Sequence, residues 1–154
     1  MEKFVAENLA RHKLLTLGTS DSEGNPWVVC LNLSYDNNLK IIWKSDKNTV
    51  HSKNLSQNPN VSICVFSQEQ DIGDFGFYAT AVAREVIDEK ELKYCLGVRS
   101  AQKGKEVPPI EDFLGDFDLR IYVAEIKEAW ATDQSHTKKK LDLASLKNFL
   151  KTNL

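Results

Sequence analysis

Residues 41–66 read IIWKSDKNTVHSKNLSQNPNVSICVF. An apolar run ends at Trp43 and passes abruptly into lysines, hydroxyl side chains and a histidine. Thr49 has the side chain of a helix N-cap, and the pair Asn58-Pro59 stops a helix, so a helix of about two turns is expected between them. Residues 61–66 are again apolar, which predicts a strand. The stretch therefore predicts a strand, a tight turn, a short helix and a second strand in succession.

The beginning of this short helix is a candidate anion site. The first turn of a helix presents free backbone N–H groups and the positive end of the helix dipole. Polar and basic side chains surround it, and together they form the donor set that a phosphate monoester requires. The alternative, which this segment alone favours, is a capped helix whose lysines lie in water. The donors are Lys44, Ser45, Lys47, Thr49, His51, Ser52 and Lys53.

The flanking residues predict a mainly β fold with antiparallel strands. The sequence SDSEGN at 20–25 supplies the residues of a tight turn, so the strands on either side of it form a hairpin. A second turn, YDNN at 35–38, leads into the strand that ends at Trp43. The predicted helices are too few for a parallel βαβ sheet, and about six strands suit a small barrel. The predicted strands are 14–19, 26–33, 39–43, 61–66, 75–87 and 119–130.

Helices are expected only at the periphery of this barrel. A short amphipathic helix at the N-terminus is predicted to end near His12, and DEKELKYCLGV at 88–98 predicts another helix. Residues 99–118 contain two prolines and two glycines, which predicts an irregular connection with one helical turn at 110–114. After the polar segment ATDQSHTKKK, a C-terminal helix is expected at about 141–153. Its apolar face consists of Leu143, Leu146, Phe149 and Leu150.

Length and composition fit one domain over residues 1–154, with the barrel at about 13–130. The chain is 42% hydrophobic, and its 20 basic and 22 acidic side chains leave a net charge of -2. No overall field therefore draws the protein to nucleic acid or to an anionic membrane. The N-terminal sequence MEKFVAENLARHKLL lacks the apolar stretch of a signal peptide or a membrane span, so we expect a cytoplasmic protein.

Several chemical signatures are absent from the sequence. No GxGxxG or GxxxxGK[ST] motif occurs, which excludes Rossmann-type and P-loop nucleotide binding, and the isolated histidines predict no metal site. No GxSxG elbow supports a hydrolase. Cys30 and Cys64 lie within apolar runs and are expected to be buried free thiols. Trp27 and Trp43 are expected to pack in the core, and either could instead form the wall of a site for a flat ligand.

Residues 13–87 resemble the pyridoxamine 5'-phosphate oxidase-like family of FMN-binding split barrels. The resemblance begins in the hairpin LLTLGTSDSEGNPWVVCLNLSYD at 14–36 and continues through the strand, helix and strand of 41–66. AVAREVIDEKE at 81–91 loosely matches a later strand of the family, and IYVAEIKEAWATD at 121–133 is similar to its last strand. The order and spacing of these motifs carry the resemblance, since each motif alone has low specificity.

The resemblance implies a six-stranded antiparallel split barrel that forms a homodimer with FMN at the subunit interface. It also implies positions for the cofactor contacts, transferred residue by residue onto this sequence. The strand after the first turn would lie along the isoalloxazine ring, and the start of the short helix would hold the phosphate. The resemblance places Val29, Cys30, Leu31 and Asn32 along the ring, Trp43, Lys44 and Ser45 at the ring and ribityl chain, and Thr49, Val50 and His51 at the phosphate.

The phosphate position departs from the family's Ser-Arg-Lys pattern. Val50 carries no charge, and His51 is a weaker cation than lysine. A neighbouring lysine must therefore supply positive charge, and the candidates are Lys44, Lys47 and Lys53.

The resemblance predicts an FMN-dependent oxidoreductase acting on a small molecule. Its substrate is expected to differ from pyridoxamine phosphate, because the substrate lysine of the true oxidases falls near Ser34 and no Arg-x-His sequence occurs. A non-catalytic flavin or haem carrier or sensor on the same barrel is the alternative. The sequence leaves open the substrate, the electron donor, and the choice among FMN, a deazaflavin and haem.

Overall fold

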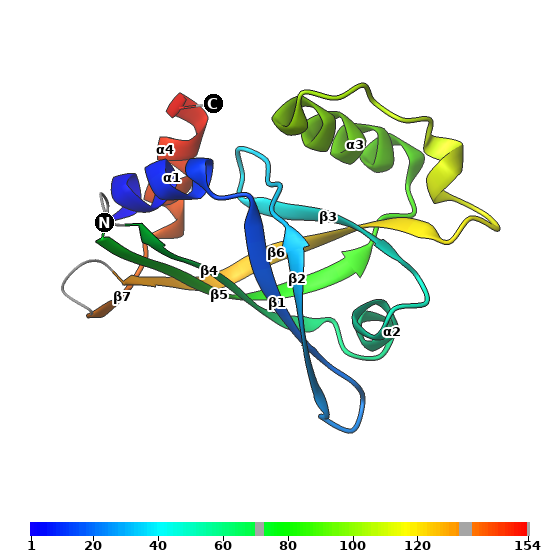
Figure 1. The fold of residues 1–154 in the computed structure, drawn as a ribbon, viewed down its shortest axis with the longest axis horizontal. Helices are drawn as coiled ribbons and strands as arrows, with labels where there is room; N and C mark the ends of the chain where they lie inside the picture. The colour runs from blue at the N-terminus through cyan, green and yellow to red at the C-terminus, as the bar shows by residue number, and fades with distance from the viewer. Residues whose placement is uncertain (70–72, 133–136, 154) are drawn as a thin grey trace.

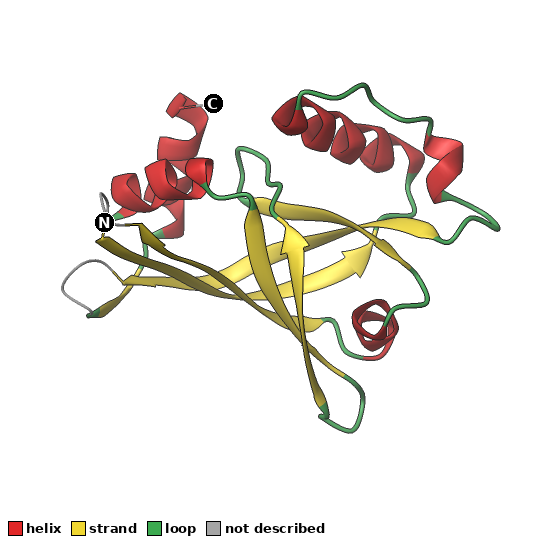
Figure 2. Ribbon diagram, in the orientation of Figure 1, coloured by secondary structure: helices red, strands yellow, loops and turns green. Residues whose placement is uncertain are grey.

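One antiparallel sheet curves around the core of the protein (Figures 1 and 2). The structure, a computed structural model, describes residues 1–69, 73–132 and 137–153. Along the sheet the order is β2-β1-β4-β5-β6-β3, and the short β7 pairs with β6. The strands are β1 (Leu14–Ser20), β2 (Pro26–Asn32), β3 (Lys40–Asp46), β4 (Asn60–Glu69), β5 (Gly73–Glu85), β6 (Leu119–Thr132) and β7 (Lys138–Lys140).

The helices lie around this sheet, as the sequence predicts. Figure 1 shows α1 (Glu2–Arg11) and α4 (Leu143–Asn153) side by side at one end of it. The short α2 (Val50–Gln57) lies beside the β1–β2 hairpin, and α3 (Glu89–Lys103) covers β3 and β6 together with the 3-10 helix η1 (Ile110–Phe113). None of the helices within the described ranges combines the length and the apolar content that a membrane span requires.

The core has two parts that share the sheet. Alternate residues of β1 point inward, so Leu15 and Leu17 are buried between the strands while their neighbours face outward. The largest fully buried side chains of the barrel interior include Trp43, Phe75 and Phe77. A smaller apolar cluster lies under α3 and η1. It contains Ile42, Val86, Leu92, Cys95, Leu96, Phe113, Ile121 and Val123.

Most predicted elements are confirmed. β4 and β5 extend toward each other to Glu69 and Gly73 because they pair there, and three further differences also have physical reasons. β3 continues past Trp43 to Asp46 because β6 pairs with it along the whole of that length. α3 continues to Lys103, where Gly104 takes a left-handed conformation with a φ of 59° and ends the helix. The predicted polar link at 131–140 contains the strand β7, although residues 133–136 of that link lie outside the described residues.

Candidate functional site

Thr49 caps α2, as its side chain predicts. Its Oγ1 accepts a hydrogen bond from the backbone N–H of Ser52 and donates one to the carbonyl oxygen of Asp46, 2.9 Å away. The hydroxyl of Ser52 also donates to this carbonyl, over 2.8 Å. Asn54 fixes the helix to β1 by donating to Thr19 Oγ1 over 3.1 Å. The hydroxyl groups at the beginning of α2 are therefore hydrogen-bonded within the protein.

His51 is also held internally. Its side chain is buried, and its Nε2 lies 2.7 Å from Oγ of Ser45 and 3.3 Å from Oγ1 of Thr49. Burial lowers the pKa of His51, because desolvation penalises the protonated ring. The ring is therefore predominantly neutral at pH 7, and it adds little positive charge to the predicted phosphate position.

The three candidate lysines lie in different surroundings. Lys47 Nζ donates to the carbonyl oxygen of Phe117 over 3.0 Å and lies 3.6 Å from Oδ1 of Asp118. Lys53 is exposed on α2, next to the partly exposed Val50. Lys44 lies on the outer side of β3, since Trp43 and Ser45 on either side of it are buried. Lys44 therefore faces the same side of the sheet as α3.

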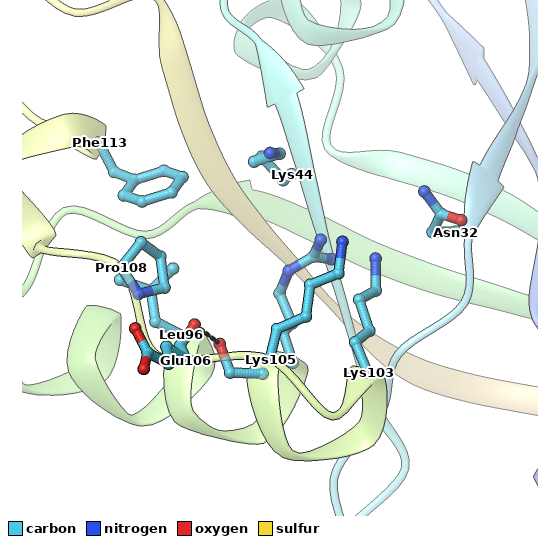
Figure 3. A pocket seen from close by; sticks show the side chains of 10 residues that line it. Asn32, Lys44, Leu96, Lys103, Lys105, Glu106, Pro108 and Phe113 are labelled. Atoms are coloured by element: carbon cyan, nitrogen blue, oxygen red, sulfur yellow. Dashed lines mark hydrogen bonds between the residues drawn. The ribbon is translucent and has the colours of Figure 1, made fainter.

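Lys44 lines a cavity of about 410 Å³, which we call the first cavity. Figure 3 shows Lys44 on β3, Asn32 at the end of β2, and Lys103 and Lys105 extending toward them from the end of α3. The volume is within the range of about 300–1,000 Å³ that small-molecule sites occupy. The complete lining is Asn32, Lys44, Leu96, Arg99, Ser100, Lys103, Lys105, Glu106, Pro108 and Phe113.

The lining of the first cavity is strongly cationic. It has four basic side chains and one carboxylate, that of Glu106. Arg99 is only 8% exposed, and its Nη1 donates to the carbonyl oxygen of Ile42 over 3.2 Å. Burial, and then the nearby charges of Arg99, Lys44 and Lys105, lower the pKa of Lys103. Such repulsion between the buried Arg99 and the exposed lysines around it favours the binding of an anion.

Local structure at the end of α3 brings these cations together. Arg99 and Lys103 are four residues apart on α3 and therefore share a face of the helix. Gly104 then reverses the chain, and the backbone N–H of Lys105 donates to the carbonyl oxygen of Ser100 over 3.0 Å. Arg99, Lys103 and Lys105 were not predicted as site residues, because the sequence of 99–118 indicates an irregular connection. The helical spacing of Arg99 and Lys103 was the signal that could have identified them.

β2 presents a free edge beside this cavity. Its one partner among the described strands is β1, so the backbone groups of its other edge have no strand partner there. Val29 and Leu31 are partly buried against the barrel core, whereas Asn32 is exposed and lines the cavity. The expectation that Cys30 is buried is wrong: the thiol lies on the exposed outer face of β2, because an edge strand has no second neighbour to cover it.

The two tryptophans differ. Trp43 is 1% exposed and stacks on Tyr122 at a ring-centroid distance of 5.7 Å, so it belongs to the core. Trp27 is 46% exposed, and its expected burial is wrong because it lies near the tip of the β1–β2 hairpin, which projects from the rest of the sheet (Figure 1). Cys64 is half-buried. In the described part of the chain, no three His, Cys, Asp or Glu side chains gather as metal ligands would.

The structure thus divides the predicted site residues into groups. Asn32 and Lys44 come together at the first cavity. Ser45, Thr49 and His51 form a hydrogen-bonded cluster at the junction of β3 and α2. The remaining predicted residues belong to neither group. They are Val29, Cys30, Leu31, Trp43, Lys47, Val50 and Lys53.

Solved structures of other proteins share this fold. A haem-binding protein from Mycobacterium smegmatis superposes with a TM-score of 0.72 at 16% identity, over 96% of this chain and 60% of that one. The haem storage protein HutZ from Vibrio cholerae gives 0.66 at 19% identity, over 82% and 90% of the two chains. ChuZ from Campylobacter jejuni gives 0.69 at 13% identity, over 93% and 63%. The chain thus spans less than two thirds of the first and third of these proteins.

Sequence comparison identifies the family. Among curated proteins, no sequence matches the chain significantly. Residues 1–133, however, match the sequence model of the pyridoxamine 5'-phosphate oxidase family. This match covers most of the chain, and the antiparallel sheet with its peripheral helices agrees with the split barrel. The chain therefore belongs to the pyridoxamine 5'-phosphate oxidase family.

Proposed function

We propose that the protein is a cytoplasmic FMN-binding flavoprotein that acts as an oxidoreductase on a small molecule. One observation carries the proposal: Asn32 on β2 and Lys44 on β3, two of the predicted flavin contacts, line the same cationic cavity. They belong to strands at opposite ends of the strand order, and the fold brings them together. Family membership supports the proposal, because the family model is that of a pyridoxamine 5'-phosphate oxidase.

The residues present fit the chemistry of FMN. A phosphate monoester carries about two negative charges. The first cavity has four basic side chains and one carboxylate, so its excess of positive charge is large enough to neutralise such a group. The free edge of β2 offers backbone donors and acceptors to the polar edge of a flavin ring. Leu96, Pro108 and Phe113 supply an apolar wall. The chain thus offers charge, hydrogen bonds and apolar surface around one volume.

FMN, when bound, supplies electron or hydride transfer. The chain's own residues then have binding and orienting roles. Asn32 and the edge of β2 fix orientation by hydrogen bonds, and Lys44 and Arg99 stabilise negative charge within the cavity. The apolar wall keeps water from that side. We assign no side chain as a general acid or base.

We also propose that a second copy of the chain covers the outer face of the sheet. Val28 is 63% exposed and Phe66 is 54% exposed on this face. Val28 lines a shallow depression of about 310 Å³ on this face, together with the small residues Gly18 and Ser62. Exposed apolar surface of this kind marks association sites in soluble proteins. A dimer through this face would place the free edge of β2 next to the partner subunit.

Haem is the second candidate ligand. The observation that favours it is the combination of a cationic rim with the apolar side chains of Leu96 and Phe113, since haem is a flat apolar molecule with two carboxylates. Two proteins of similar fold are described as haem-binding or haem-storage proteins. In this case the protein would act as a carrier or sensor without its own turnover.

The absorbance spectrum of the protein as isolated, with mass identification of any released ligand, tests these proposals. We expect flavin bands and the mass of FMN. A Soret band would show that the ligand is haem, and the mass of a deazaflavin would show that the coenzyme is a deazaflavin and not FMN. If the protein is colourless and added FMN retains its full fluorescence, the FMN proposal is wrong.

The position of the phosphate is tested by comparing FMN with riboflavin, which lacks it. We expect Lys44→Gln with Arg99→Gln to weaken FMN by about tenfold or more and riboflavin much less, because two cations near a phosphate are lost. The matched comparison is Thr49→Ala with Lys47→Ala. A selective loss of FMN in this second variant would instead place the phosphate at the beginning of α2, and equal loss of both ligands would indicate a folding defect.

A further inference from the structure

A second cavity adjoins the first. It has a volume of about 540 Å³ and lies between the end of α1, the residues that follow β2, and the last turn of α3. Asn32, Lys103 and Lys105 line both cavities, so the two volumes share a wall. Lys13, just before β1, also lines the second cavity. A ligand in the second cavity would therefore be in contact with the proposed flavin site.

The second cavity has an unbalanced charge. Three lysines line it, and its lining includes no aspartate or glutamate. In the described part of the structure, no ion pair engages the ammonium groups of Lys13, Lys103 or Lys105. The three ammonium groups are thus available to a ligand.

Gln102 and His12 also line this wall, and each makes a hydrogen bond to the backbone. Gln102 Nε2 donates to the carbonyl oxygen of Tyr35 over 2.6 Å, and Gln102 Oε1 accepts from the backbone N–H of the same residue over 3.2 Å. His12 Nδ1 lies 2.7 Å from the carbonyl oxygen of Asn8, whereas His12 Nε2 is buried without a hydrogen-bond partner among the described residues. Leu9 and Leu33 complete an apolar floor. The three lysines carry the unbalanced charge of this lining, and they favour an anionic ligand.

We propose that the second cavity binds the diphosphate of an electron donor or acceptor that reacts with the flavin, a molecule of the dinucleotide class. The role as reaction partner rests on the proposed function, whereas the binding site rests on the residues above. Lysine is a flexible point donor that suits phosphate oxygens. The lysines come from two segments, the residue before β1 and the end of α3, which suits an anion with two charged centres better than a single phosphate. Binding would also relieve the repulsion that Lys103 experiences from Arg99, Lys44 and Lys105.

Calorimetric titration with inorganic pyrophosphate and with orthophosphate tests the site directly. We expect pyrophosphate to bind the wild-type protein, with and without added FMN, and to bind more tightly than orthophosphate. Lys13→Gln combined with Lys103→Gln should weaken pyrophosphate by about tenfold or more, because two nearby cations are lost. The control is Lys90→Gln combined with Lys93→Gln, which removes the same charge from exposed positions of α3 that line neither cavity. Thermal unfolding verifies that the variants fold, and Lys13→Gln alone replaces the pair if the pair does not.

Three results would overturn the inference: no binding of pyrophosphate, equal weakening in the lysine pair and its control, or orthophosphate binding as tight as pyrophosphate. The first two remove the site, and the third removes the diphosphate class. If the wild-type protein binds pyrophosphate but not FMN, the proposed function is wrong and the pyrophosphate site remains. If the wild-type protein binds FMN but not pyrophosphate, the pyrophosphate site is wrong and the proposed function remains.

Discussion

His51 Nε2 lies 2.7 Å from the hydroxyl oxygen of Ser45, and this contact joins the first turn of α2 to the end of β3. Both side chains are also predicted ligand contacts, and the hydrogen bond between them fixes their positions relative to each other. The pair therefore connects two elements, and a cluster of positive charge lies nearby on β3 and α3, around Lys44.

The buried His51 predicts a dependence of stability on pH. Burial holds its pKa below the ordinary value of 6.5, so the unfolded chain takes up this proton before the folded protein does. The stability that depends on the neutral ring is present in full above pH 6.5 and is lost as the pH falls through the lower pKa of the folded protein. Urea unfolding between pH 7.5 and 5 should show this loss, and His51→Gln should reduce it. An identical pH profile for the variant would contradict the role of His51.

Removal of the α2 cap should destabilise the protein. Thr49→Ala removes the acceptor for the backbone N–H of Ser52 and the donor to the carbonyl of Asp46. We expect a loss of about 1 kcal/mol in the free energy of unfolding, the usual cost of an N-cap. Thr49→Ser keeps the hydroxyl and is the matched control for urea unfolding. Equal losses in the two variants would show that the methyl group, rather than the hydrogen bonds, matters.

Charge on the outer face of the sheet should prevent dimerisation. Val28→Glu combined with Phe66→Glu places two carboxylates on the proposed interface, and light scattering should then give the mass of one chain. The control is Ile87→Glu, because Ile87 is 76% exposed and lies away from this face, between β5 and α3. A dimeric mass for the double variant, or a single-chain mass for the wild type, would refute this interface.

The cysteines should react in order of exposure. Alkylation requires the thiolate, and burial raises the pKa of Cys95 to about 11 and raises that of Cys64 to a lesser extent. Iodoacetamide at pH 8 should therefore modify exposed Cys30 first and Cys95 only after unfolding, as followed by peptide mass spectrometry. In the dimer Cys30 would be covered, so the Val28→Glu and Phe66→Glu variant should expose it to faster reaction. The same rate in both proteins would argue against coverage of β2.

The C-terminal helix should contribute to stability through one part of its predicted apolar face. Leu146 is fully buried and Leu150 is 2% exposed, whereas Phe149 is 36% exposed. Leu146→Ala should lower the free energy of unfolding by about 2–5 kcal/mol through the cavity that it leaves. Phe149→Ala should have a clearly smaller effect in the same urea unfolding experiment. A small effect at Leu146 would show that α4 does not pack on α1 in solution.

Sequence reasoning succeeded where local signals determine structure. The β1–β2 hairpin follows from its turn residues, and the beginning and end of α2 follow from Thr49 and Asn58. It failed where contacts between segments distant in the sequence determine the length of a strand or the exposure of a side chain. The length of β3 depends on pairing with β6, β7 forms because Trp130 and its neighbours accept another strand, and the exposure of Cys30 depends on the absence of a second neighbour beside β2 in the described sheet.

Only part of the candidate site could be predicted, because its residues come from segments that are distant in the sequence. Asn32 and Lys44 were identified because they lie on the two strands that carry the family resemblance. Arg99, Lys103 and Lys105 lie beyond those motifs, and their relevance depends on the packing of α3 across β3. Charge alone could not identify them, since the sequence contains 20 basic residues.

The pairing of β3 with β6 has a consequence for synthesis on the ribosome. β3 follows β2 closely in the chain, yet Asp46 pairs with Leu119 and Lys40 with Glu125. β3 must therefore wait for most of the chain to be translated before its partner exists, and such distant pairings form slowly. The space between Asn32 and Lys44 takes shape only at this late step. Ligand would then bind only to a chain whose barrel is complete. A nascent chain that stops before β6 would expose an unpaired β3, to which chaperones could bind.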